Sequence, residues 1–513
     1  MNPAPKYVAT IGLEVHAELA TKSKMFCACK NNPDEEKPNV SICPVCMAHP
    51  GTLPVLNHEA IKHVLKVGHA VKGNIADFTE WDRKQYFYPD IPKGYQISQY
   101  KYPLISGGEL AGVALTRIHL EEDTAQSTHD TTGALVGGTG RSVTDKSLVN
   151  YNRAGVPLME LVTEPVIHDA ETAVRFAKEL QLLLRYLGAG EANLEKGEMR
   201  VEANISIATP EDTAARKFGT KTEVKNLNSF RAVERAIAYE IARHTKILDK
   251  NATGDLSEKI VQETRGWDES SQKTFSQRKK ESAHDYRYFP DPDIPKLRLS
   301  EISDFSEAAI TKEMPELPWE KRIRYKTAYE LTDKEVAVFI ENEQLSTYFE
   351  EILTALGSGK NESDKKKIRL TVNYLLTDYA GLLKKEFGEG DFISHIVAIT
   401  PQQFAKLIEL IASGKVNSRG GKDTLALMYA EAKIGQVTDP EVIAEKNGFI
   451  QKNDEGEIRK IAESIVAANP QVVADYKAGK AVALQFFVGQ GMKATKGSAN
   501  PELLKVIFVS LLG

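Results

Sequence analysis

The sequence predicts an α+β fold: a cradle-like antiparallel-sheet domain, followed by an all-α middle domain and an all-α tail domain. Segments within the first 295 residues alternate polar and apolar side chains with the two-residue period of a half-buried strand. After Pro295 the alternation stops, and charged and apolar residues follow the helical period instead. We therefore expect domains at residues 1–295, 296–405 and 406–513.

Composition is that of an ordinary globular protein with enough apolar material for several cores. The chain has 513 residues, of which 42% are hydrophobic and 27% charged. Its net charge of −5 argues against a protein that coats nucleic acid through bulk charge, although a local basic surface remains possible. No apolar run reaches the length of a bilayer span, and the N-terminus lacks the apolar core of a signal peptide. We expect a protein of the cytoplasm or an organelle matrix, without a membrane partner.

Four predicted strands each carry one row of polar side chains. The rows are Glu14, His16 and Glu18; Arg117, His119 and Glu121; Glu198, Arg200, Glu202 and Asn204; and Lys221, Glu223 and Lys225. A sheet with one wet face explains the alternation, but it does not explain why carboxylates and histidines dominate these rows. Clustered carboxylates repel one another unless a cation neutralises them, and oxygen-rich sites of this kind suit magnesium. We expect the four strands to be neighbours that build a concave magnesium site.

All four cysteines lie in two close pairs. They are Cys27, Cys29, Cys43 and Cys46. Two close pairs joined by a short loop match a four-thiolate zinc site, although the first pair is more tightly spaced than the usual C-x₂-C. Free or disulfide-bonded cysteines are the alternative, and disulfides are rare in the cytosol. Four protein ligands leave zinc no open position, so such a site would be structural.

The segment His284–Pro295 combines aromatic rings, prolines and three aspartates, and Tyr86–Pro92 partly repeats it. Prolines exclude a helix here, because each disfavours the α conformation in the residue before it. They also exclude an interior strand, because proline donates no ladder hydrogen bond. We predict a stiff extended segment, either a packed surface loop or part of a site.

Helices are predicted from Ala170 to Leu187 and from about Ser229, where apolar residues recur at helical spacing. Further helices should begin where a capping side chain precedes a proline. These positions are Thr400-Pro401, Asp439-Pro440, Asn469-Pro470 and Asn500-Pro501.

Of three polar or glycine-rich segments, two allow two interpretations each. The basic run Asp364–Arg369 is either a solvated helix face or a phosphate contact. Gly137–Ser142 lacks the Walker lysine and spacing, so we interpret it as a flexible loop. Gly489–Gly497 is predicted as a glycine-bracketed turn near a helix N-terminus, where Lys493 and Lys496 could hold a phosphate backbone. An ordinary interhelical loop is the alternative.

Ordered blocks along essentially the whole chain carry a family resemblance. They include Ile11–His16, Cys43–Cys46, Pro50–Asn57, Tyr86–Asp90, Tyr95–Gln99, His119–Asp123, Tyr151–Leu158, Lys225–Ser229, Gln262–Arg265, His284–Pro295 and Met492–Gly497. With these blocks the chain resembles the B subunits of aspartyl/glutamyl-tRNA amidotransferases.

The resemblance implies conversion of Glu-tRNA(Gln) to Gln-tRNA(Gln), and often of Asp-tRNA(Asn) to Asn-tRNA(Asn). In this family the B subunit activates the side-chain carboxylate with ATP and magnesium. A glutaminase A subunit supplies ammonia, and a small C subunit ties the assembly together. The cysteines give a separate hint: if zinc holds all four thiols, none remains as a glutaminase nucleophile.

The resemblance also implies roles for individual residues. The catalytic candidates are Glu14, His16, Glu121, Glu122, Glu202 and Glu223, of which Glu14, His16, Glu122 and Glu223 would hold magnesium. Candidates for binding ATP or the substrate are Lys84, Tyr86, Tyr88, Asn226 and Arg287. Lys493 and Lys496 would contact tRNA, and Cys27, Cys29, Cys43 and Cys46 would hold zinc.

Two other functions stay open from the sequence: a non-catalytic tRNA-binding scaffold, and a stand-alone carboxylate ligase unrelated to tRNA. The chain also departs from the family pattern. Residues 128–146 look longer than usual, and Asn150 and Val166 stand where we expect aspartate. The final helix near residues 506–512 is more apolar than expected.

Overall fold

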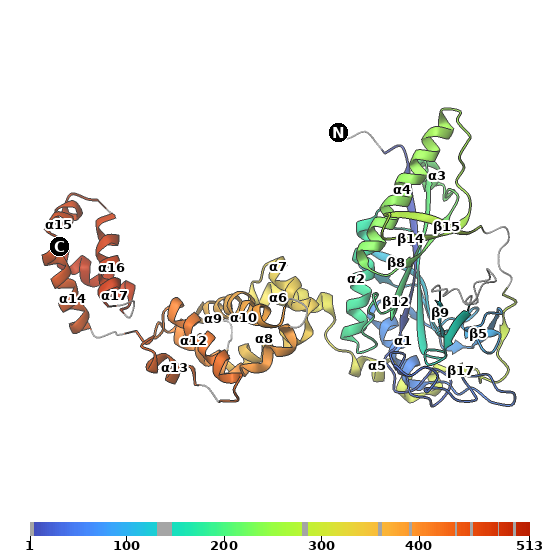
Figure 1. Ribbon diagram of the computed structural model, residues 1–513, viewed down its shortest axis with the longest axis horizontal. Coiled ribbons are helices and arrows are strands. Elements are labelled where there is room, and N and C mark those ends of the chain that lie inside the picture. The colour runs from blue at the N-terminus through green and yellow to red at the C-terminus, as the bar shows by residue number, and fades with distance from the viewer. Residues whose placement is uncertain are drawn as a thin grey trace, which may run out of the picture. The chain divides into compact units, whose positions relative to one another are not determined.

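The computed structural model describes residues 5–130, 146–279, 286–357, 362–388, 392–436, 439–451, 455–480, 482–495 and 499–513. Lys496, His284, Asp285 and the glycine-rich Gly137–Ser142 lie outside these ranges. The chain forms two compact units, Met1–Pro318 and Trp319–Gly513 (Figure 1). The first contains a large sheet and the second is helical, so the predicted order of a sheet region before helices is confirmed. The finer boundaries near residues 295 and 405 stay predictions.

A ten-stranded sheet forms the centre of the first unit. Its strands are β1 (Val8–Glu18), β2 (Asn74–Ile75), β6 (Ile105–Ser106), β7 (Glu109–Leu110), β8 (Val113–Glu122), β11 (Pro157–Thr163), β12 (Met199–Ala208), β13 (Thr222–Leu227), β14 (Glu263–Asp268) and β15 (Lys273–Lys279). The order is β15-β14-β13-β12-β1-β11-β8-β6-β2, with β7 also paired to β8. All neighbours are antiparallel except β13 and β14. The predicted strands are neighbours with one exception: β11 lies between β1 and β8.

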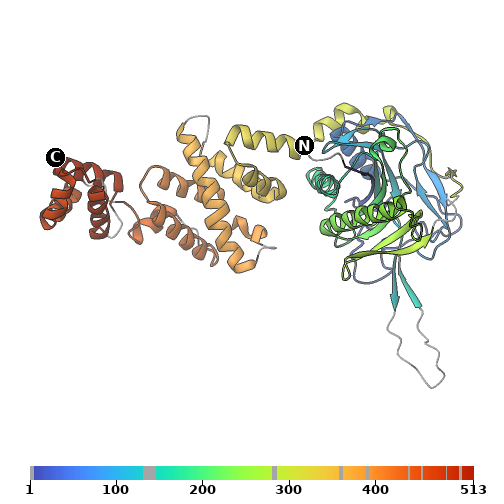
Figure 2. The same ribbon diagram turned by 90° about the horizontal axis from the view of Figure 1, so that it is seen from above.

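Helices cover the apolar face of the sheet. Leu13, Val15 and Ala17 of β1 are fully buried on this face. Helix α4 (Phe230–Ala252) packs against β12, β13 and β15, and α2 (Ala170–Tyr186) packs against α4 (Figure 1, Figure 2). Helix α1 (His58–Ala70) packs against β8 and against α5 (Glu307–Glu313). Both predicted helices of this region are therefore confirmed.

A second, three-stranded sheet lies next to the polar face. Its order is β16-β4-β5, with β4 at Asp82–Gln85, β5 at Tyr95–Ser98 and β16 at Phe289–Pro290. The remaining elements of the unit are β3 (Phe78–Thr79), β9 (Gln126–Asp130), β10 (Lys146–Asn150), β17 (Leu297–Arg298), α3 (Pro210–Ala214) and the short helices η1 (Leu299–Glu301) and η2 (Ser303–Phe305). Strands β9 and β10 pair as the described ends of the insertion at residues 128–146.

As predicted, the described part of the proline-rich segment is neither a helix nor an interior strand, since it contributes the edge strand β16 to the small sheet. It is not extended throughout, because the chain turns at Pro292–Ile294. Two of its aspartates bind one arginine of β4: Arg83 donates to Asp291 at 2.7 Å and to Asp293 at 2.8 Å. These two carboxylates therefore fix the segment to the sheet.

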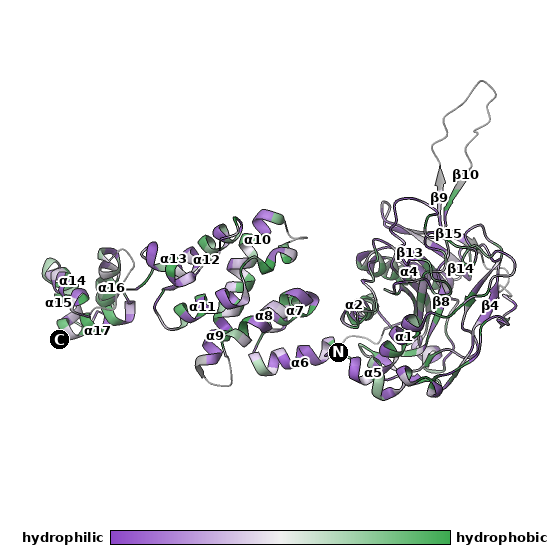
Figure 3. Ribbon diagram, turned by 90° about the horizontal axis from the view of Figure 1, so that it is seen from below, coloured by the Kyte–Doolittle hydropathy of each residue, from purple (hydrophilic) through white to green (hydrophobic). Residues whose placement is uncertain are grey.

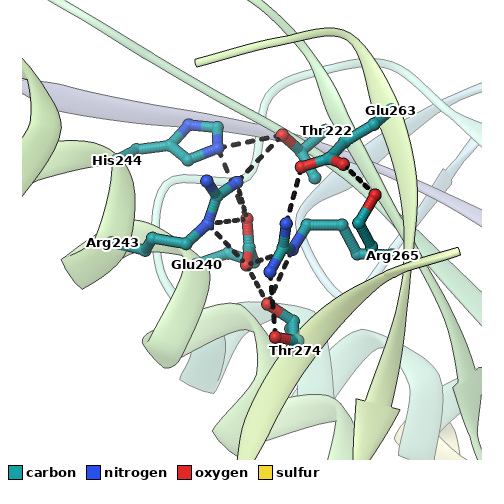
Figure 4. A network of polar contacts seen from close by, with 8 residues as sticks. Thr222, Glu240, Arg243, His244, Glu263, Arg265 and Thr274 are labelled. Atoms are coloured by element: carbon teal, nitrogen blue, oxygen red, sulfur yellow. Dashed lines mark hydrogen bonds and ion pairs between the residues drawn. The ribbon is translucent and has the colours of Figure 1, made fainter. Parts of the chain in front are cut away.

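A buried polar network ties α4 to the neighbouring strands (Figure 4). Glu240 of α4 is fully buried and accepts hydrogen bonds from Arg243 at 2.7 Å and from Thr274 of β15 at 2.5 Å. His244 lies 3.4 Å from the same carboxylate and 3.0 Å from the Thr222 hydroxyl of β13. A buried carboxylate is stable only when it is paired in this way.

The second unit consists of helices on which hydrophobic and hydrophilic residues alternate (Figure 3). They are α6 (Pro318–Tyr329), α7 (Asp333–Glu341), α8 (Glu343–Ala355), α9 (Glu362–Asn373), the π-helical η3 (Tyr374–Tyr379), α10 (Ala380–Phe387), η4 (Phe392–Ala398), α11 (Pro401–Ala412), α12 (Ser418–Ala432), α13 (Pro440–Lys446), α14 (Glu455–Ala468), α15 (Pro470–Lys477), α16 (Val482–Ala494) and α17 (Pro501–Leu512). Within the described residues, no helix is both long and apolar enough to cross a membrane.

The four predicted helix starts are all present, and three have the expected side-chain cap. Thr400 forms a capping box with Gln403, and the side chains of Asp439 and Asn500 accept hydrogen bonds from their first helical turns. Asn469 makes no such hydrogen bond, so its predicted cap is wrong, although α15 does begin at the following proline.

The basic run on α9 contacts carboxylates and a carbonyl of its own unit. Arg369 binds Glu335 at 2.5 Å, Lys366 donates to the Ala412 carbonyl at 2.9 Å, and Lys365 pairs with Glu330. These contacts favour the interpretation of the run as a structural helix face.

The predicted turn is wrong for residues 489–494, because Gly489 and Gly491 lie within α16. Gly491 faces α17 closely: a Cβ atom added there would lie 2.8 Å from Cδ2 of Leu504. Helices α14 to α17 share a core that includes Leu504, Ile507 and Phe508, which explains why the final helix is so apolar.

Candidate functional site

Strand register brings a row of charged residues together on the polar face of the large sheet. His16 of β1 lies opposite Glu160 of β11, and Glu160 lies opposite His119 of β8. On the other side of β1, Glu14 lies opposite Glu202 of β12. Directly opposed residues of antiparallel strands have Cβ atoms about 5 Å apart, so the pairing alone makes these side chains neighbours.

The side-chain atoms of this cluster converge on His16. Its Nε2 lies 3.4 Å from Glu160 Oε2, 3.6 Å from Glu121 Oε1 and 3.8 Å from Glu14 Oε1. His119 contacts the same carboxylate oxygen of Glu160 at 3.5 Å. Glu160 therefore joins β1 to β8 through their histidines.

Two groups in this cluster have the spacing of metal ligands. Glu14, His16 and Glu160 form one, and His119, Glu121 and Glu160 form the other, with ligand atoms within 4.8 Å of one another in each. Within the described part of the chain, Glu121 Oε2 is buried and has no hydrogen-bond partner. Buried carboxylate oxygens without partners are costly, and a divalent cation would satisfy them. The residues present therefore fit a magnesium ion.

Burial and neighbouring charge push the pKa values of the cluster apart. Burial raises the pKa of Glu121 to about 7 and lowers that of His119 to about 4. Burial also disfavours the charged forms of His16 and Glu160, but hydrogen bonding and neighbouring charges have the larger effect on their pKa values. The hydrogen bond to Glu160 and the nearby carboxylates raise the pKa of His16 to about 9, and His119 and His16 hold the pKa of Glu160 well below its usual range.

Basic side chains balance the outer carboxylates. Lys225 of β13 lies 2.8 Å from Glu202 and 3.9 Å from Glu223. Arg200 of β12 binds the buried Asp123 at 2.7 Å. These cations are placed to meet an anionic ligand beside the acidic centre.

Lys84 contributes a further cation from β4 of the small sheet. Burial disfavours its charge, yet the negative charge of Glu121 and its neighbours outweighs burial and raises the Lys84 pKa. The ammonium group therefore stays charged and faces the acidic cluster.

The cluster lines a cleft of about 550 Å³ between the large and the small sheet. Tyr86, Tyr286 and Tyr288 contribute to its wall. Tyr288 stacks on Tyr100 with ring centroids 4.3 Å apart. The cleft thus combines a floor of carboxylates and histidines with aromatic and basic walls, which suits an anionic ligand that carries a planar ring.

The structure brings most of the predicted site residues into this cleft. They are Glu14, His16, Glu121, Glu202, Glu223, Lys84 and Tyr86. Tyr88, which is 63% exposed, is not part of the lining, and neither are the exposed Asn226 and Arg287. Lys493 is an exposed residue in the last turn of α16, in the second unit.

Glu122 is not brought together with the other carboxylates. Its neighbour Glu121 faces the cleft, and successive strand residues point to opposite faces, so Glu122 points away. Its carboxylate is bound by Lys93 at 2.6 Å and by the Ile97 backbone N–H at 3.0 Å. It lines a separate pocket of about 230 Å³ beside Cys27. We therefore leave Glu122 out of the magnesium ligand set proposed below.

Sequence reasoning missed Glu160, the central residue of the cluster. The available signal was one carboxylate within the otherwise apolar stretch Pro157–Val162. His119 lay in a predicted polar row, but its contact with Glu160 could not be seen without the position of β11.

The four cysteine sulfurs lie within 4.8 Å of one another, so the predicted cluster is confirmed. None is in a disulfide. The Sγ atoms of Cys43 and Cys46 are 3.9 Å apart. In a tetrahedral zinc site they would lie about 3.8 Å apart, given a Zn–S distance of about 2.3 Å. The cluster therefore fits zinc.

Comparison with known proteins shows similarity along nearly the whole chain. Residues 9–303 match the family model described as the GatB/GatE catalytic domain, and residues 348–512 match that described as the GatB domain. The aspartyl/glutamyl-tRNA(Asn/Gln) amidotransferase B subunit of Thermoanaerobacter pseudethanolicus is 41% identical over 510 residues, which cover 98% of each chain. The B subunit of the same enzyme from Thermodesulfovibrio yellowstonii is 40% identical over 515 residues, covering 99% of each.

Proposed function

The chain belongs to the family of aspartyl/glutamyl-tRNA amidotransferase B subunits, and we propose that it activates the side-chain carboxylate of a misacylated tRNA with ATP. The substrate would be Glu-tRNA(Gln), Asp-tRNA(Asn) or both. The observation that carries the proposal is the approach of Glu14, Glu121 and Glu160 to His16 at the floor of an open cleft.

The chemistry explains why such a cleft is needed. A carboxylate is a poor electrophile, so one of its oxygens first attacks the γ-phosphate of ATP, giving an acyl phosphate and ADP. Ammonia then attacks the carbonyl carbon and phosphate leaves, which forms the amide. Phosphoryl transfer depends mainly on positioning and on neutralising the charge of the phosphate oxygens.

Separate groups in the cleft suit separate parts of this task. Glu14, His16, Glu121 and Glu160 would hold a magnesium ion, which when bound offsets negative charge on the phosphates. We infer that Lys84, Arg200 and Lys225 neutralise the remaining phosphate charge from the walls. The tyrosines beside them would limit the access of water to the acyl phosphate.

The chain would need partner subunits, because it would not produce ammonia itself. With all four thiols in one cluster, no cysteine remains as a nucleophile for glutamine hydrolysis. We propose that a glutaminase A subunit delivers ammonia and that a small C subunit joins the assembly. Aminoacyl-tRNA would contact the helical unit, where Lys493 and Lys496 remain candidates.

A structural zinc ion is the second part of the proposal. Cys27, Cys29, Cys43 and Cys46 would hold it, because four thiol groups converge with the spacing of a tetrahedral site. Zinc would then fix the loop between the two cysteine pairs, which otherwise contains little regular structure.

The test is ADP release by the chain assembled with its A and C partners, with ammonium as nitrogen donor. We compare Glu-tRNA(Gln), Asp-tRNA(Asn) and uncharged tRNA. Glu160→Gln removes a central carboxylate and should lower release. Changing residues that only orient metal ligands costs roughly 10–100-fold, so this loss should be at least as large. Glu164→Gln is the matched control, since Glu164 lies just beyond the end of β11 and does not line the cleft.

Release that requires charged tRNA and is lost only in Glu160→Gln would locate the activating site on this chain and identify its substrate. Equal release with uncharged tRNA, or an active Glu160→Gln variant, would contradict the proposal. The scaffold function, in which a partner holds the active site, would then be favoured.

A further inference from the structure

Lys24 is a lysine in an unusual place. Its side chain lies next to the cysteine cluster, and only 1% of the residue is exposed. Lysines are almost never fully buried unless a negative group accompanies them, because removing an ammonium ion from water is energetically costly. The position therefore requires an identifiable counter-charge.

The contacts of Lys24 show which groups could supply this counter-charge. Its Nζ lies 3.2 Å from the Tyr151 carbonyl oxygen and 4.0 Å from the Sγ of Cys46. Among the residues that the structure describes, Lys24 forms no ion pair with a carboxylate. Glu122 lies on the other side of Gly155, but its carboxylate is already bound by Lys93 at 2.6 Å. The dipole of the Tyr151 carbonyl alone does not balance the full charge of the Lys24 ammonium. The cysteine sulfurs therefore remain as its counter-charge.

The local backbone is shaped to keep Lys24 and the cluster together. A Cβ atom added at Gly155 would lie 3.6 Å from Cδ of Lys24 and 3.7 Å from Cβ of Cys46. Gly155 has a φ of 85°, a left-handed conformation that favours glycine. The loop that carries it therefore packs directly on both side chains and holds the ammonium near the sulfurs.

We propose that Lys24 is the built-in counter-cation of a divalent metal centre formed by the four cysteines. Four thiolates and one divalent ion carry a net charge of −2, and the Lys24 ammonium reduces it to −1 inside the protein. The Cys43 N–H, which donates to the Cys46 sulfur at 3.1 Å, disperses the charge further. The inference rests on the proposed zinc centre and adds a positioning charge that is not itself a ligand.

The test is the zinc affinity of the purified full-length chain, measured by competition with a chromophoric chelator. Lys24→Met removes the charge but keeps an apolar stem, and should weaken zinc binding roughly 10–100-fold, as expected for a group that supports metal ligands. Lys22→Met is the matched control, because Lys22 is exposed two residues away and should leave the affinity unchanged.

A second readout separates charge from geometry. The absorption spectrum of the cobalt-substituted chain reports tetrahedral thiolate ligation. Weaker binding of Lys24→Met with an unchanged cobalt spectrum supports the proposal. Wild-type affinity in that variant, or weaker binding with a changed spectrum, overturns it. If Lys24→Met does not fold, the test uses Lys24→Arg, which keeps the positive charge. A zinc affinity within about threefold of wild type then supports the proposal, and a larger loss overturns it.

The zinc centre and the role of Lys24 fail in distinguishable ways. A wild-type chain that holds no stoichiometric metal would remove both. Stoichiometric zinc with equal affinity in wild type and Lys24→Met would remove only the counter-cation and leave the zinc centre standing.

Discussion

Glu160 contacts the histidines of both neighbouring strands and so connects the two sides of the acidic cleft. It reaches His16 on β1 and His119 on β8 through the same oxygen. Its low pKa keeps it charged across the physiological range, whereas Glu121 titrates with a pKa of about 7. One strand residue thus provides a permanent negative charge between the two histidines.

The buried Glu240 should make the stability of the first unit depend on pH. Burial raises its pKa, but hydrogen bonds from His244, Arg243 and Thr274 prevail and lower it to about 2. A carboxyl whose pKa is depressed in the folded state stabilises the fold above its unfolded pKa of about 4.5 and loses this effect as pH falls toward 2. The contribution is on the order of 3 kcal/mol.

Urea unfolding followed by tryptophan fluorescence measures this contribution, since Trp267 lies on β14 within the same unit. Glu240→Gln should be less stable than wild type at pH 6, and the difference should shrink as the pH approaches 3. A difference that stays constant over this range would contradict the role assigned to the Glu240 charge.

A site residue could be predicted from the sequence where the alternation within its own strand determines the face on which it lies. The alternation in β1 put Glu14 and His16 on one face without further information. Glu160 could not be predicted, because nothing local shows that β11 separates β1 from β8. Glu122 adjoins Glu121 in sequence and was expected beside it, but the pleat directs its side chain to the other side.

Helix starts were predicted well, because caps and prolines act within one turn. Thr400 and Asn500 cap their helices as expected. The glycines of α16 misled the prediction, because glycine disfavours a helix by only about 1 kcal/mol, and tertiary packing outweighs that cost. At Gly491 the close approach of α17 favours the helix, and the local sequence does not reveal this contact.

Two glycines of α16 offer a matched pair of substitutions. A Cβ at Gly491 would lie 2.8 Å from Leu504, whereas nothing lies within 4 Å of one at Gly489. Gly491→Leu should therefore destabilise the α14–α17 group by about 1–3 kcal/mol, because it overpacks that core. Gly489→Leu should instead stabilise it by a few tenths to about 1 kcal/mol through helix propensity.

Hydrogen exchange of residues 482–512 in the full chain reports both changes. Faster exchange in Gly491→Leu and slower exchange in Gly489→Leu are expected. Equal effects of the two substitutions would show that α17 does not pack on Gly491.

At the scale of the whole molecule, the chain forms two compact units, and both candidate sites belong to the first. The acidic cleft and the cysteine cluster both lie in Met1–Pro318. Within the other unit, α11 packs against α8 and α9, while α14 to α17 share their own core. The part of the chain after residue 451 is therefore a natural piece to remove without disturbing α11.

Ending the chain after Gln451 should separate tRNA binding from ATP binding. If the α14–α17 group contacts tRNA, as proposed, affinity for tRNA should fall at least about tenfold, which corresponds to about 1.4 kcal/mol. Affinity for ATP in the presence of magnesium should not change, because the cleft lies in the first unit. Filter binding and calorimetry measure the two affinities. Unchanged tRNA affinity would refute the assignment of the tail.

The pocket that Glu122 lines and the cleft that Glu121 lines share β8 as a common wall, and this limits how the gene can vary in length. Inserting or deleting one codon in β8 would shift the strand by one residue and exchange the faces of the two carboxylates. The cleft would then lose Arg117, His119 and Glu121 together, because their whole row turns to the other face, although none of these residues had been replaced. Length variants within 113–122 should thus be purged more strictly than substitutions there.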